Sequence, residues 1–83
     1  MLRVLFFASI RERLGCAGTE VAGVAGDTVA ALVARLEAGP LPGCSRWLAA
    51  PNTLVAVNQV LGGPDSALVD GDEVAFYPPV TGG

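Results

Sequence analysis

The chain has 83 residues and a net charge of −3, with five arginines and neither lysine nor histidine. A domain of this length buries only about 60–65% of the surface that its unfolded chain exposes, so a deep internal active site is not expected. The missing residue types exclude Ser-His-Asp triads, histidine-ligated metals and Schiff-base chemistry, and two isolated cysteines (Cys16 and Cys44) cannot supply a four-thiolate metal centre.

Residues 2–8 are predicted to form the first strand because they are rich in β-branched and aromatic side chains. Side chains alternate between the two faces of a strand, so Arg3, Leu5 and Phe7 share one face. Arg3 marks this face as the wetter one, and Phe7 is therefore expected where water or a partner reaches it. The apolar run is too short to cross a membrane and Arg11 follows at once, so a cytoplasmic protein is expected rather than a signal peptide.

The middle of the chain predicts one main helix. Residues 9–14 indicate a short turn or a single helical turn before Gly15, and residues 19–24 a second strand. Asp27 or Thr28 can cap the helix that follows, and Gly39-Pro40 ends it. An i, i+3, i+4, i+7 spacing predicts that one stripe of this helix is buried: Val29, Leu32, Val33 and Leu36.

The second half of the chain predicts further strands. Residues 41–52 are rich in proline and glycine, and a helical turn there would place Trp47 at the edge of the core. Residues 53–58 indicate a third strand, residues 59–61 a short strand or turn, and residues 73–77 the last strand. Asp70-Gly71-Asp72 predicts a tight turn with solvated carboxylates rather than a calcium loop, which would need more oxygen ligands.

This order of elements predicts an α+β fold of the β-grasp (ubiquitin-like) type. A mixed sheet of four to five strands would carry the main helix on one face. The first and last strands are strongly apolar and are expected at the centre of the sheet. The other face, with Leu5, Phe7 and Tyr77, would stay open. Residues 1–77 would form the domain, and residues 78–83 an extended tail.

The tail sequence, Tyr77-Pro78-Pro79-Val80-Thr81-Gly82-Gly83, indicates where chemistry occurs. Two prolines favour an extended conformation, and the four residues after them can reach about 13 Å. Gly82 and Gly83 lack a Cβ and can enter a channel too narrow for other residues. These features favour a terminal carboxylate delivered into another protein's active site, whereas an inert, frayed end is the plain alternative.

A carboxylate is a poor electrophile because it is an anion without a good leaving group. An ATP-dependent partner would first make the acyl-adenylate of Gly83, and sulfur would then displace AMP to leave a thiocarboxylate. This chemistry needs no catalytic side chain on the carrier. We therefore expect no permanently bound cofactor and no metal on this chain, with ATP used by the activating enzyme.

The sequence resembles the small subunit of molybdopterin synthase, the MoaD family. Residues 41–52 do not follow the family closely, and the lack of lysine is unusual. The last fourteen residues carry the most specific part of the resemblance, whose segments are residues 4–8, Arg11-Glu12, Thr28-Val29, residues 56–59 and residues 70–83.

The resemblance implies a set of partners. A ubiquitin-activating-like adenylyltransferase would activate Gly83, and a persulfide enzyme would donate sulfur. The tail would insert into the large synthase subunit, in a heterotetramer of two large and two small subunits, where the dithiolene is built on a pterin precursor. Gly82 and Gly83 would form the reacting end. Residues implied to contact partners are Phe7, Arg11, Leu61, Tyr77, Pro78, Pro79, Val80 and Thr81.

Other functions remain open at this point. The same tail chemistry would serve a carrier for thiazole, cysteine or thiolated tRNA synthesis. A protein modifier joined through Gly83 is a third hypothesis, although a chain without lysine cannot build polymers on itself. A plain interaction domain is a fourth. The sequence lacks the basic stripe that would indicate a nucleic-acid partner. It leaves open the acceptor pathway, the affinities for partners and the exposure of Cys16 and Cys44.

Overall fold

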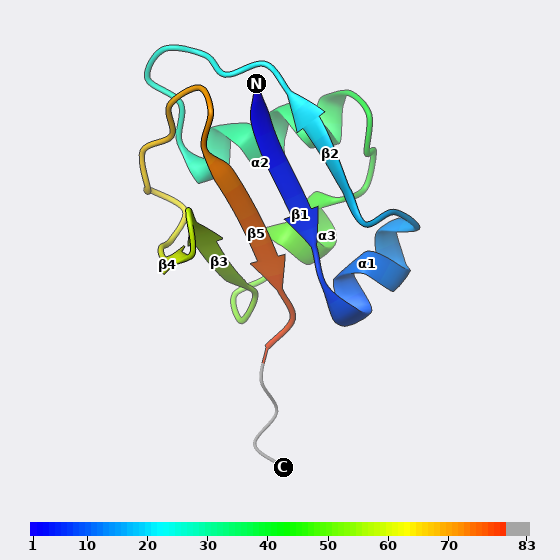
Figure 1. The fold of residues 1–83 in the computed structure, drawn as a ribbon. Helices are drawn as coiled ribbons and strands as arrows, with labels where there is room; N and C mark the ends of the chain where they lie inside the picture. The colour runs from blue at the N-terminus through cyan, green and yellow to red at the C-terminus, as the bar shows by residue number, and fades with distance from the viewer. Residues whose placement is uncertain (80–83) are drawn as a thin grey trace.

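The computed structural model describes residues 1–79 of the chain (Figure 1). Residues 80–83 lie outside the described part. Because the predicted tail spans residues 78–83, the division into a domain of residues 1–77 and a tail stays a prediction. In chain order the elements are β1 (Leu2–Phe6), α1 (Ala8–Leu14), β2 (Gly18–Val21), α2 (Val29–Ala38), α3 (Ser45–Leu48), β3 (Leu54–Val57), β4 (Val60–Leu61) and β5 (Glu73–Tyr77).

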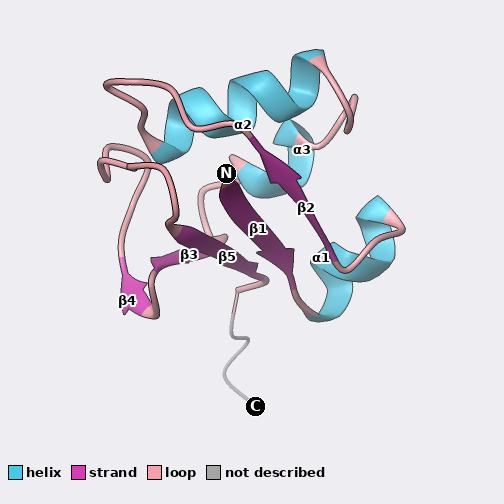
Figure 2. Cartoon of the chain, turned by 45° about the horizontal axis from the view of Figure 1, so that its top comes forward, coloured by secondary structure: helices cyan, strands magenta, loops and turns pink. Residues whose placement is uncertain are grey.

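The five strands form one mixed sheet in the order β2-β1-β5-β3-β4. β1 pairs with β5 in parallel, and the other neighbours pair antiparallel. The first and last strands, β1 and β5, lie side by side at the centre of the sheet, as the sequence predicts. α2 and α3 cover one face of the sheet, and Figure 2 shows both on the same side of it. The β-grasp prediction is confirmed.

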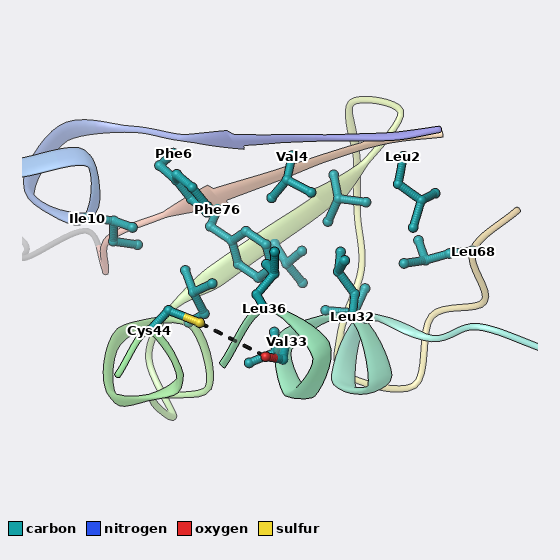
Figure 3. Close-up of a cluster of buried hydrophobic side chains, with 14 residues drawn as sticks. Leu2, Val4, Phe6, Ile10, Leu32, Val33, Leu36, Cys44, Leu68 and Phe76 are labelled. Atoms are coloured by element: carbon teal, nitrogen blue, oxygen red, sulfur yellow. Dashed lines mark hydrogen bonds between the residues drawn. The ribbon is translucent and has the colours of Figure 1, made fainter. Parts of the chain in front are cut away.

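The core fills the space between α2 and the sheet (Figure 3). Leu32 and Leu36 are fully buried, and Val29 and Val33 nearly so, which confirms the predicted stripe. Thr28 caps α2, because its Oγ1 accepts a hydrogen bond of 3.2 Å from the Ala31 N–H. The strands contribute a facing set of buried side chains: Leu2, Val4, Phe6, Val55, Val74 and Phe76.

Asp27, the other predicted cap residue, has a different role. Its buried carboxylate accepts hydrogen bonds from the Val24 N–H at 3.1 Å and from the Arg35 guanidinium. Arg35 also donates to the Ala22 carbonyl at 2.8 Å. The pair ties the loop after β2 to the middle of α2, so that breaking it would leave a buried charge without its partner.

The first strand is shorter than predicted, and the first helix is longer. β1 ends at Phe6, and α1 begins at Ala8, whose φ of 51° turns the chain sharply out of the sheet. Ile10 is buried against the core, which explains why the helix forms over seven residues rather than one turn. Gly15 ends it with φ 74°. β2 is also shorter than predicted, ending at Val21.

Glu37, near the end of α2, organises the proline- and glycine-rich segment that follows. Its carboxylate accepts hydrogen bonds from the Gly43 N–H, the Ser45 N–H at 3.0 Å and the Ser45 hydroxyl at 2.5 Å. These bonds fix the start of α3, a single turn with Leu48 buried and Trp47 half-buried at the edge of the core. Cys44 is buried next to the Val33 carbonyl (Figure 3), and burial raises the pKa of its thiol.

We predict a contribution of Glu37 to stability that depends on pH. The Ser45 hydroxyl, followed by the Gly43 and Ser45 N–H groups, lowers the pKa of the folded carboxyl. The contribution is therefore complete above the unfolded pKa of about 4.3 and is lost as pH falls through the lower folded value. Urea unfolding between neutral and strongly acidic pH should show a smaller decline for Glu37→Gln than for wild type. Equal declines in the two proteins, and in Ser45→Ala, would contradict this role.

Candidate functional site

Two aromatic rings stack at the place where β5 ends. β1 and β5 run parallel with Phe6 opposite Phe76, so the residues that follow, Phe7 and Tyr77, lie side by side. Their ring centroids are 4.7 Å apart and their planes differ by 5°. The Phe7 N–H also donates to the Phe76 carbonyl at 3.2 Å, which extends the pairing by one residue. Each of the two residues is 37% exposed, on the sheet face that α2 does not cover.

The stack is one end of an apolar strip that crosses four strands. Leu54 lies opposite Tyr77, and Ala56 lies opposite both Ala75 and Leu61. The two alanines are small enough to lie buried between larger neighbours, whereas Leu61 on the edge strand is 70% exposed. We call this set the open face: Leu5, Phe7, Leu54, Ala56, Leu61, Ala75 and Tyr77. A contiguous exposed apolar surface of this kind is typical of a protein interaction site.

The same sheet face becomes polar at its other end. Arg3 pairs with Glu73 at 3.2 Å and lies opposite Glu20 on β2. The apolar part is therefore confined to the half of the face from which the tail sequence departs. Pro78 is half-buried and Pro79 exposed, directly after the stack. A partner that covers the open face would also meet the base of the tail.

Of the four contact residues predicted before the tail, the structure places three on one sheet face and the fourth elsewhere. Phe7 and Tyr77 are in contact, and Leu61 lies across the same face on β4. Arg11 lies on α1, exposed and outside the sheet. The remaining tail predictions fall on residues outside the described part: Val80, Thr81, Gly82 and Gly83.

The acidic turn before β5 makes internal contacts. Asp72 accepts hydrogen bonds of 2.9 Å from the Val69 N–H and from the Asn58 amide, and both lower the pKa of its carboxyl. Asp70 pairs with the terminal amine. Over residues 1–79, no cluster of His, Cys, Asp or Glu is arranged to hold a metal ion. No helix in the same range is long and apolar enough to cross a membrane.

The sequence pattern does not identify Leu54 and Ala56 as members of the open face. The strand prediction for residues 53–58 gives no face assignment, because Leu54, Val55, Ala56 and Val57 are all apolar. Only the pairing with β5 shows that Leu54 and Ala56 share the face of Tyr77. Ala56 begins a segment of the family resemblance, and this is the signal in the sequence that points to its importance.

These features define a class of protein: a ubiquitin-like β-grasp domain that has an open apolar sheet face and a sequence ending in Gly-Gly. The chain belongs to the ThiS family, whose profile matches residues 4–83. It is 49% identical over 86 aligned positions to a protein of Escherichia coli named molybdopterin synthase sulfur carrier subunit, with all of both chains covered. The protein of the same name in Haemophilus influenzae is 42% identical over the same span.

Solved structures agree with this assignment. CysO of Mycobacterium tuberculosis superposes with a TM-score of 0.75 at 28% identity, with 96% of this chain and 100% of that chain covered. A complex of subunits 1 and 2 of the molybdopterin-converting factor of Helicobacter pylori contains a chain that superposes with a TM-score of 0.66 at 28% identity. That match covers 99% of this chain and 97% of the other.

The contact between Phe7 and Tyr77 should be measurable as a coupling energy. In a double-mutant cycle with Phe7→Ala and Tyr77→Ala, we expect the two losses of unfolding free energy to be non-additive by about 0.5–1.5 kcal/mol, as for other stacked aromatic pairs. Urea unfolding of the four proteins gives the value. Phe7→Ala combined with Val69→Ala serves as the distant control and should be additive. Additivity for both pairs would contradict the stack.

Proposed function

We propose that this chain is the sulfur-carrier subunit of molybdopterin synthase and works through a thiocarboxylate on Gly83. The observation that carries the proposal is its 49% identity, over the full length of both chains, to a relative of that name. The geometry supports it, because a central strand leads directly into the tail sequence beside an apolar face. The chain would be the sulfur-donating part of a sulfurtransferase complex, without catalytic side chains of its own.

Activation proceeds in three steps at the terminal carboxyl group of the chain. The carboxylate of Gly83 attacks ATP and forms an acyl-adenylate with release of pyrophosphate. A persulfide sulfur then attacks the carbonyl carbon and the C–O bond to AMP breaks. A thiol reductant cleaves the S–S bond of the resulting acyl disulfide and leaves the thiocarboxylate. The thiocarboxylate is an anion and a soft nucleophile, so its sulfur attacks the pterin precursor without free sulfide. Water then cleaves the C–S bond, which leaves the sulfur on the precursor and restores the carboxylate of Gly83.

The partners follow from this scheme. The large synthase subunit would cover the open face and receive the tail, as the complex of two subunits in the Helicobacter pylori structure suggests by analogy. We extend this to a heterotetramer of two large and two small subunits, to an adenylyltransferase that uses ATP, and to a cytoplasmic setting. Phe7, Leu61 and Tyr77 would contact the large subunit, with Pro78 to Thr81 along its channel.

Activation should be visible in the intact mass of the chain. After incubation with ATP, a sulfur donor and the cell's activating enzyme, we expect an increase equal to the difference between one sulfur and one oxygen atom. A chain that lacks Gly83 should show no change. An unchanged wild-type mass, with an enzyme shown to be competent on another substrate, would contradict the proposal and favour an inert tail. Conjugates of higher mass would instead indicate a protein modifier.

The open face can be tested with two matched variants. Leu61 and Val69 are similarly exposed, at 70% and 68%, and neither belongs to the core, but only Leu61 lies on the open face. Leu61→Ser should weaken binding to the large subunit by about tenfold, within the range found for interface residues. Val69→Ser should bind like wild type. Calorimetry with the purified large subunit measures both affinities. Equal affinities would show that Leu61 is not part of the interface.

A further inference from the structure

The arginines of this chain fall into two groups. Arg3 and Arg35 are paired with Glu73 and Asp27. The other three make no ion pair within residues 1–79, and they lie on two neighbouring elements, α1 and α3: Arg11, Arg13 and Arg46. In a protein with a net charge of −3, the unpaired positive charge is therefore gathered on one side of the molecule, near the strand end from which the tail departs (Figure 1).

Two of these arginines are held on a tryptophan. The guanidinium carbon of Arg13 lies 4.7 Å from the centroid of the Trp47 ring, and that of Arg46 lies 5.7 Å away. A cation over an indole ring is attracted by the ring's quadrupole, so both guanidinium groups are oriented while their N–H donors stay accessible. We call Arg13, Arg46 and Trp47 the arginine–tryptophan platform.

The platform has a rigid base. Ile10 on α1 and Leu48 on α3 are buried in the core, which fixes both elements beneath it. The bonds from Ser45 to Glu37 fix the start of α3. Two arginines with preset positions lose less conformational entropy on binding than free surface arginines do. This favours a binding role over two independent solvated charges.

Two hollows flank the platform. One, of about 410 Å³, is lined by all three platform residues and by the loop of residues 40–43. The other, of about 310 Å³, is lined by Arg13 and Trp47 on one side and by Pro78 and Pro79 on the other. Arg13 and Trp47 thus form the wall between them. The second hollow connects the platform to the base of the tail without crossing the open face.

We propose that the arginine–tryptophan platform docks an acidic segment of the enzyme that adenylates the tail. Guanidinium groups bind carboxylates through paired hydrogen bonds, and the first hollow has room for side chains between the two arginines. A nucleic acid fits less well, because the chain is acidic overall and its unpaired arginines within residues 1–79 form a small basic area rather than a long stripe. The inference rests on the proposed function, because it assumes that a second protein activates Gly83.

The character of the two surfaces suits them to different kinds of contact. The open face is apolar and suits the subunit with which the carrier forms a lasting complex. Exposed charges contribute more to the rate of association than to affinity, and they suit an enzyme that must meet and release the carrier in every cycle. The two surfaces lie on different sides of the base of the tail. An activating enzyme can therefore approach along the platform.

The test compares two double variants with the same change in net charge. Arg13→Gln with Arg46→Gln removes two positive charges from the platform. Ala31→Glu with Ala34→Glu adds two negative charges on the exposed side of α2. The measurement is kcat/KM for adenylation of the carrier, at low and at high salt, together with affinity for the large subunit. Urea unfolding confirms that each variant is folded.

The platform variant should lose about tenfold in kcat/KM at low salt, and less at high salt, where wild type also slows. The α2 variant should stay within about twofold of wild type, since exposed charges at a distance are screened. Arg13→Lys with Arg46→Lys keeps the charge and should recover part of the low-salt rate. Affinity for the large subunit should not change in any of these proteins.

Equal rates for the platform and α2 variants would overturn the proposal. A loss confined to binding of the large subunit would overturn it as well, because it would assign the platform to the other partner. If the enzyme adenylates a known substrate but not the wild-type chain, the proposed function fails and this inference fails with it. The rate of adenylation of the wild-type chain thus distinguishes a failure of the proposed function from a failure of the platform proposal alone.

Discussion

The parallel pairing of β1 with β5 is the constraint on which the rest of the structure depends. It aligns the beginning of the chain with its last strand, from Arg3 opposite Glu73 to Phe6 opposite Phe76. Parallel neighbours end at the same edge of the sheet, so β1 turns into α1 at the point where β5 runs into the tail sequence. The chain therefore leaves the domain from the centre of the sheet, and the base of the tail is fixed by the central strands.

The small size of the domain explains why no internal active site is expected. A domain of 83 residues has room for one core, and here it lies between α2 and one face of the sheet. The other face keeps its apolar side chains for a partner. The alanines in the middle of this face, Ala56 and Ala75, leave the larger side chains at its ends to protrude. In the proposed function, the partner supplies the catalytic groups and this chain supplies the sulfur.

Much of the fold could be predicted because its signals are local and periodic. The stripe of α2 and the alternation of β1 and β5 each follow from one short stretch of sequence. The segment of residues 41–52 could be predicted only as a helical turn with Trp47 at the edge of the core. What fixes this turn depends on Glu37, whose carboxylate accepts bonds from residues six and eight positions further along the chain. No periodicity reveals such a contact. The extent of α1 was missed because a single buried residue, Ile10, stabilises it.

The candidate site, like the fold, could be predicted from the sequence only in part. Phe7 and Tyr77 were predicted on the open face from strand alternation, but their stacking depends on the register between β1 and β5, which sequence pattern does not fix. Leu54 and Ala56 required the partner strand to be known. The pairing of Arg13 and Arg46 on Trp47 joins elements more than thirty residues apart and had no signal in the sequence.

The central claim is that sulfur reaches the pterin precursor from Gly83 of this chain, and a single-turnover reaction tests it most directly. The chain would be prepared with a thiocarboxylate at Gly83, labelled with a sulfur isotope, and mixed with the large subunit and the precursor. The account predicts that the label leaves the chain only when both are present, restores the carboxylate and appears in the dithiolene. A label that stays on Gly83, or a dithiolene that forms without it, would contradict the account.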